Sequence, residues 1–314
     1  MDLKVFSPTE LEAVLRALRN VALENHVFTD AERALIEGVA RVHGQSVDGD
    51  SLRPISVDEV ARVVVAPHQR KRAVQLAIVM ALVEGEPSDA GRRSVAALAT
   101  ALDIDEEGLA VLSEVTEGHA MLARFDMVRR FTRYIRNAPD FPGVLKVALP
   151  ALGIGSGDQR LAARYRALAE CAPGSFGRAF YDHFIDNDFK LPGEPGGLPL
   201  AFHDVGHVLS GYGTDPQGEI QQAAFQAGFV RTDGFAFLLF GILQFHVALR
   251  ITPVAKGYRG LFDVDLVLRA LERGAACNVD LGRDFDVFEH QDKPLDELRR
   301  ELSIPALAPL AQAS

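Results

Sequence analysis

The chain is organised around residues 201–225, whose sequence is Ala201-Phe-His-Asp-Val-Gly-His-Val-Leu-Ser-Gly-Tyr-Gly-Thr-Asp-Pro-Gln-Gly-Glu-Ile-Gln-Gln-Ala-Ala-Phe225. On a helix, His203, Asp204 and His207 fall inside roughly a 100° arc, which lets their side chains converge on one point. The glycines and the proline that follow favour a turn and cannot continue this helix. Glu219 then opens a second helix, so a tight helical hairpin is predicted to return its carboxylate to the two histidines.

Two imidazoles with one or two carboxylates form a donor set of borderline softness, suited to zinc or to iron-like ions. The pattern therefore predicts a divalent-metal site at His203, Asp204, His207 and Glu219, with zinc as the first expectation and iron or another transition metal as the alternative. A His-Asp pair on a helix is also typical of a capping or surface hydrogen bond. Spacing alone does not decide between the two interpretations.

Length and composition set the broad class of the protein. A chain of 314 residues, 48% of them hydrophobic, is long enough for two domains, each with a sizeable core. The net charge of −10 argues against a nucleic-acid partner. Cys171 and Cys277 are far apart and have no C-x-x-C partner, which favours a reduced, cytoplasmic chain. The first ten residues lack a basic segment followed by an apolar one, so no signal peptide is expected.

Residues 1–118 are predicted to form an acidic domain of short amphipathic helices. They carry 12 Lys and Arg against 20 Asp and Glu. Ser/Thr-x-x-Glu capping boxes predict three helix starts, at Ser7/Glu10, Thr29/Glu32 and Ser56/Glu59. The segments after Ala22 and Ala81, 59 residues apart, look like two copies of one helical hairpin. This part resembles the tellurite-resistance B-like domains, which are all-helical modules with acidic loops. We expect it to have a role in protein contacts.

Residues 119–148 change character and are predicted to form a basic amphipathic helix. Six Arg and Lys stand against two Asp, while apolar residues line one face. Two interpretations remain open. In the first, the helix contacts an anionic membrane surface, and the protein is then cytoplasmic with a peripheral position on the inner membrane face. In the second, the helix is a linker that docks onto the acidic N-terminal part.

The longest apolar stretch, Phe235 to Ile251, contains too many polar residues and is too short for a membrane span. It is predicted to form a buried helix, either within a core or beside a lipid-sized pocket. His246 and Arg250 near its end are interpreted either as contacts for a polar head group or, for the histidine, as a hydrogen-bonded core residue.

The C-terminal part, residues 119–306, resembles the coenzyme Q biosynthesis protein 4 family. The resemblance rests on H-D-x-x-H followed after eleven residues by Glu219, within Gly218-Glu-Ile220. Supporting matches are Pro173-Gly-Ser-Phe-Gly-Arg178, the apolar segment 237–249 and Leu295-x-x-Leu-Arg-Arg-Glu-Leu302. The chain departs from the family in having no tryptophan and in carrying the N-terminal module.

The resemblance implies an all-α protein with domains at 1–118 and 119–314, the second a helical bundle with a metal site and a lipid-binding groove. It implies that a polyprenylated benzoquinone precursor is bound and oxidatively decarboxylated at ring carbon C1. The divalent metal would lie at His203, Asp204, His207 and Glu219, and the first two would carry the catalytic roles. A homodimer and partners in a biosynthetic complex are also implied.

Two other classes of function remain open. One is a non-catalytic lipid-binding scaffold with a structural metal, which organises a biosynthetic complex. The other, ranked last, is a phosphohydrolase of the H…HD…D kind, which would use His183 with His203-Asp204 and a later acid such as Asp233. That alternative explains neither His207 nor Glu219.

Overall fold

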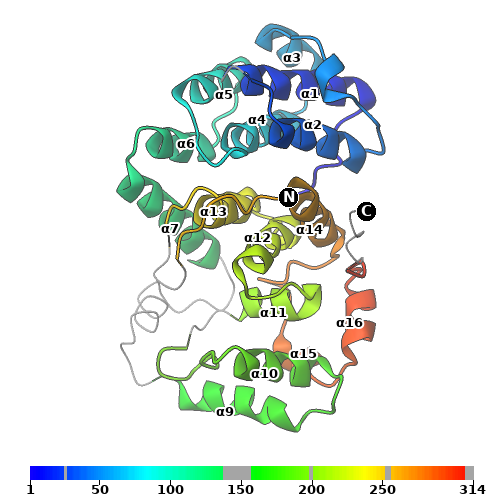
Figure 1. Cartoon of the computed structure of the whole chain (residues 1–314). Coiled ribbons are helices and arrows are strands. Elements are labelled where there is room, and N and C mark those ends of the chain that lie inside the picture. Colours follow the sequence, from blue (N-terminus) through cyan, green and yellow to red (C-terminus); the bar gives the residue numbers. More distant parts are fainter. Residues whose placement is uncertain (25–26, 137–156, 198–200, 252–255, 308–314) are drawn as a thin grey trace.

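The structure is a computed structural model that describes residues 1–24, 27–136, 157–197, 201–251 and 256–307 (Figure 1). Within these ranges the chain is all-helical and forms no β-strand, which confirms the predicted fold class. Two isolated bridges, Ser175 with Pro294 and Val247 with Arg259, join loop backbones without building a sheet.

The N-terminal part consists of short helices grouped at one end of the molecule (Figure 1). They are α1 (Pro8–Leu23), α2 (Asp30–Val42), the 3₁₀ turn η1 (Gly49–Ser51), α3 (Val57–Val63), α4 (Pro67–Leu82), α5 (Asp89–Ala101) and α6 (Gly108–Thr116). All three predicted capping boxes are present. The side chains of Ser7, Thr29 and Ser56 each accept a hydrogen bond from the backbone N–H of the glutamate three residues later, and the side chain of that glutamate accepts one from the backbone N–H of the cap residue. From Ala73 to Leu82, α4 is buried on every side and forms the middle of this part.

The C-terminal part is built around one central helix. Its helices are α7 (Ala120–Arg136), α9 (Gln159–Ala167), the 3₁₀ turn η2 (Leu168–Glu170), α10 (Phe176–Asp186), α11 (Phe202–Ser210), α12 (Pro216–Phe229), α13 (Phe235–Phe245), α14 (Val264–Ala276), α15 (Val287–His290) and α16 (Leu295–Glu301). Helix α12 packs against α11, α13 and α14 (Figure 1). Its contact with α14 is backbone to backbone, since a Cβ on Gly274 would lie 2.0 Å from the carbonyl oxygen of Phe225.

Helix α7 connects the two parts and exposes both basic and apolar side chains. Arg129 and Arg133 form ion pairs with Glu107, so the basic side docks on the acidic N-terminal part, as one of the two interpretations predicted. The exposed face beside these arginines also carries apolar residues, Met121, Leu122, Phe125 and Val128. The helix predicted over 119–148 is described only as far as Arg136, and the remainder of that prediction lies outside the described residues.

A buried ionic cluster lies where α7 meets its neighbours. Arg130, with 1% of its side chain exposed, binds Glu106 at 3.4 Å and Asp233 at 2.6 Å. Farther along, α2 contacts α14 through the ion pair of Arg41 with Asp265. One hydrophobic core runs through both parts of the chain. The division at residue 118 remains a prediction.

The apolar stretch that begins at Phe235 is helical only to Phe245, so the prediction of a helix continuing to Ile251 was wrong. Long-range polar contacts end it. The buried His246 bonds through Nε2 to the carbonyl of Val83 at 2.8 Å, and its Nδ1 accepts from the N–H of Phe262 at 3.1 Å. This histidine is therefore a hydrogen-bonded core residue. No described helix combines the length and the apolar character needed to cross a membrane.

Candidate metal centre

The α11–α12 hairpin has the predicted form, and its turn explains how the ligands meet. Helix α11 ends at Gly211, whose left-handed φ of 80° is a conformation that glycine adopts without strain. Asp215 caps α12 by accepting from the N–H groups of Gln217 at 3.0 Å and Gly218 at 3.2 Å. Glu219 consequently lies in the first turn of α12 and faces the end of α11.

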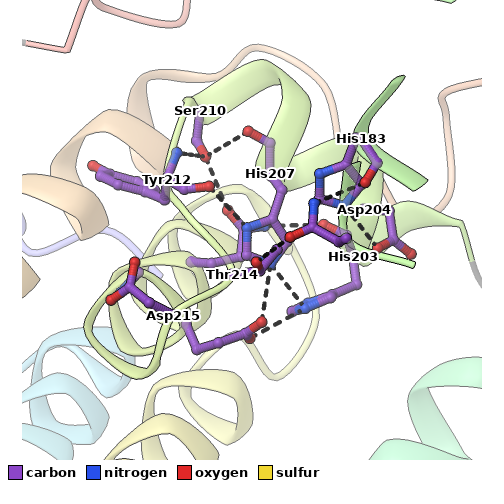
Figure 2. Close-up of polar contacts among 12 residues, drawn as sticks. His183, His203, Asp204, His207, Ser210, Tyr212, Thr214 and Asp215 are labelled. Carbon is purple, nitrogen blue, oxygen red and sulfur yellow. Dashed lines mark hydrogen bonds and ion pairs between the residues drawn. The ribbon is translucent and has the colours of Figure 1, made fainter. Parts of the chain in front are cut away.

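Three of the predicted ligands converge on one point (Figure 2). The Nε2 atoms of His203 and His207 lie 3.1 Å apart. Glu219 places Oε2 3.3 Å from Nε2 of His203 and Oε1 3.5 Å from Nε2 of His207. Across the described ranges, this is the group of His, Cys, Asp and Glu donors close enough together to hold a metal ion.

The second nitrogen of each imidazole is held by an oxygen atom. Nδ1 of His207 lies 3.0 Å from the carbonyl oxygen of Tyr212, and Nδ1 of His203 lies 3.1 Å from Oε1 of Gln226. Oxygen acceptors of this kind fix the proton on Nδ1 and leave the Nε2 lone pair free, which is the usual support for a metal-bound histidine. Two lone pairs that face each other at 3.1 Å repel unless a cation lies between them. The geometry therefore requires either a proton or a metal ion.

Charge in the site is arranged to hold such a cation. Burial alone lowers the pKa of His203, but the hydrogen bond and negative charge of Glu219 outweigh it and raise the pKa to about 9. Burial raises the pKa of Glu219, yet the two histidines outweigh this and hold it far below its ordinary value. A metal-free site thus carries a proton on His203 beside an ionised Glu219.

The donor spacing fits a small transition-metal ion. Ligand atoms about 2.0–2.1 Å from a tetrahedral zinc ion lie about 3.3–3.4 Å from one another. The two Nε2 atoms lie 3.1 Å apart, and each lies 3.3 or 3.5 Å from one oxygen of Glu219, Oε2 for His203 and Oε1 for His207, so these separations are close to that value. Three protein ligands leave at least one coordination position for water or substrate, as catalytic sites require.

Buried polar groups fix the backbone of α11 around the ligands. Gln222, which is fully buried, donates from Nε2 to the carbonyl of His203 at 3.3 Å and accepts from Oγ of Ser210 at 3.0 Å. Arg299 on α16 donates to the carbonyls of Leu209 at 2.9 Å and Val208 at 3.0 Å. The two Arg299 bonds satisfy carbonyls that the end of a helix leaves without partners.

The fourth predicted ligand, Asp204, does not join the converging donors. Its Oδ1 lies 3.2 Å from Nε2 of His183 on α10, and Figure 2 shows the carboxylate turned toward that ring. Asp233, named for the phosphohydrolase alternative, pairs with Arg130. Sequence reasoning missed the supporting Gln222 and Gln226, although a signal was present. They follow Glu219 by three and seven residues and so share one face of α12 with it.

Fold and geometry together define an all-helical protein with a candidate His₂–Glu metal centre. Neither a scan of the chain against protein-family models nor a search of curated proteins gave a match.

Proposed function

We propose that the protein binds a polyprenylated benzoquinone precursor and acts on ring carbon C1 by metal-dependent oxidative decarboxylation. One observation supports the metal-dependent part most strongly. Two Nε2 lone pairs and a carboxylate converge, while oxygen acceptors occupy both Nδ1 atoms. The quinone substrate rests on the sequence resemblance.

The reaction replaces the ring carboxyl group, which leaves as carbon dioxide, by a hydroxyl group. It needs an oxygen atom and a two-electron oxidant, and it balances with water as the source of the hydroxyl oxygen and with dioxygen as the oxidant, which is reduced to hydrogen peroxide. A divalent ion at the site, most readily zinc or iron, supplies a Lewis acid for the carboxylate or phenolate of the head group. His207 is almost fully buried and anchors the centre, whereas 37% of the His203 side chain is exposed and marks the side open to a head group.

A non-catalytic scaffold is the second candidate, and one observation favours it. The α7 stripe of Met121, Leu122, Phe125 and Val128 is 48–72% exposed, which is unusual for large apolar side chains and typical of a contact surface. In that function the metal is structural and the stripe binds partner proteins of a biosynthetic complex or the inner membrane face. A cytoplasmic location and a homodimer belong to the proposal in either case.

The deciding experiment compares the wild type with His207→Ala and with the exposed control His68→Ala. We expect stoichiometric metal by elemental analysis and a co-purified polyprenyl compound by mass spectrometry in the wild type and the control. The His207→Ala variant should lose the metal and the release of carbon dioxide from a polyprenylated hydroxybenzoate. Metal without turnover favours the scaffold, and a wild type that turns over substrate without metal overturns the proposal.

A further inference from the structure

The imidazole of His183 lies beside the candidate metal centre but is not one of its three converging donors. It comes from α10, and its Nε2 is 3.2 Å from Oδ1 of Asp204, the residue next to the ligand His203. Both side chains are largely enclosed, with 11% of His183 and 17% of Asp204 exposed. This carboxylate thus has a specific partner in a position shielded from water.

Ring contacts fix the orientation of His183. Its imidazole stacks on that of His207 with 5.5 Å between centroids and 22° between planes. Phe184 and Phe189 contact it edge-on at 5.6 Å and 5.9 Å. Aromatic contacts of this kind hold a ring in one orientation. The N–H that His183 offers to Asp204 is therefore preorganised.

A carboxylate beside a metal ion has two ways to satisfy its charge. It can bind the ion, or it can accept a hydrogen bond from a nearby donor. Asp204 lies on the same helical arc as His203 and His207, so rotation of its side chain would turn it toward the ion. In the structure it faces His183 instead (Figure 2).

We infer that His183 is a positioning residue that holds Asp204 out of the ligand set. The ion is then bound by His203, His207 and Glu219 alone and keeps an open coordination position. This inference rests on the proposed metal centre and explains why a chain with four potential ligands presents only three. A released Asp204 fills the open position and converts the centre into a closed, structural one.

Cobalt(II) is the probe, because its visible absorption depends on which donor atoms fill its coordination positions, so that a bound water and a carboxylate in the fourth position give different spectra. Wild type, Asp204→Asn, His183→Phe and the double variant His183→Phe/Asp204→Asn are compared. Phenylalanine keeps the aromatic contacts and removes only the N–H, and His183→Gln is the matched control that retains a donor. His183→Leu is a second apolar replacement should the phenylalanine variant fold poorly.

We expect Asp204→Asn to bind cobalt(II) within about threefold of the wild type, since Asp204 is not a ligand. His183→Phe should bind cobalt(II) at least about tenfold more tightly than the wild type, an effect of the size that hydrogen-bond partners of metal ligands have. Its visible absorption should change to that of a site in which Asp204 fills the fourth position. The double variant should return to wild-type values, and His183→Gln should stay there.

Two results overturn the inference while leaving the metal centre intact. One is a tenfold loss of affinity in Asp204→Asn, which would make Asp204 a ligand already. The other is unchanged affinity and absorption in both His183→Phe and His183→Leu. A wild type that binds no cobalt(II) removes the metal centre itself, and the inference with it.

Discussion

Gly206 and Gln222 approach so closely that a Cβ on the glycine would lie 1.9 Å from Nε2 of the glutamine. Gly206 lies on α11 between the candidate ligands His203 and His207, and Gln222 follows Glu219 on α12. The missing side chain therefore sets how near the two ligand-bearing helices come to each other.

Replacement of Gly206 by alanine should displace Gln222 and break its bonds to His203 and Ser210. Leaving such buried groups unpaired costs about 1–3 kcal/mol, so the free energy of unfolding should fall by that amount in urea titrations, and cobalt(II) affinity should fall as well. The double variant Gly206→Ala/Gln222→Ala restores space and should be less destabilised than the two single losses added together. Full additivity would contradict this account.

Metal binding should become tighter as the pH rises. The raised pKa of His203, about 9, means that the metal must displace a proton at neutral pH. Apparent affinity should increase about tenfold per pH unit between pH 7 and 9 and then level off. Competition with a chelator across this range measures it, and a flat profile argues against the ion pair of His203 with Glu219.

The same ion pair should make the metal-free protein more stable at neutral pH than at high pH. A histidine with a raised pKa in the folded state contributes its full stabilisation below the unfolded value, about 6.5, and loses it as the pH passes the folded value. The melting temperature should therefore drop between about pH 6.5 and 9. Glu219→Gln lacks the negative charge that raises the pKa of His203, so in this variant the drop in melting temperature should largely disappear.

Arg299 should affect the metal centre from another helix. Its replacement by alanine leaves the carbonyls of Val208 and Leu209 without their donor, at a cost of about 1–2 kcal/mol in unfolding free energy. Because these residues follow His207 directly, cobalt(II) affinity should fall too. Arg300 is the control on the same helix, since within the described residues its side chain bonds to the carbonyl of Asp296 on α16 itself. Equal effects of the two alanine variants would rule out a specific clamp.

Loss of Arg130 should destabilise the protein more than loss of any exposed arginine. An Arg130→Met variant leaves Glu106 buried without its guanidinium, and breaking a buried ion pair costs about 3 kcal/mol or more. Gln75 and Lys71 still contact Glu106, which places the cost at the low end of that range. Urea unfolding against Arg133→Met, whose ion pair with Glu107 is exposed, gives the comparison.

Features that depend on neighbours in the sequence were predicted well. Capping boxes need only residues three apart, and each of the three formed as expected. The meeting of His203, His207 and Glu219 follows from two helical periods and one turn, so spacing alone was informative. The supporting Gln226 obeys the same periodicity and could have been found by the same reasoning.

Features that depend on residues far apart in the sequence were not predicted. The end of α13 is set by Val83 and Phe262, which no local pattern connects to His246. The orientation of Asp204 is set by His183 on another helix, whereas the helical arc predicted only that Asp204 would lie near its neighbours. Side chains with several potential partners choose among them by tertiary geometry.

The turn between α11 and α12 has a consequence for the order of events when the chain is synthesised. Eleven residues separate His207 from Glu219, so closing this short loop costs little chain entropy. All three candidate ligand residues are synthesised before α13, α14 and α16. An ion bound by the hairpin at that stage would be in place before α14 and α16 pack against it.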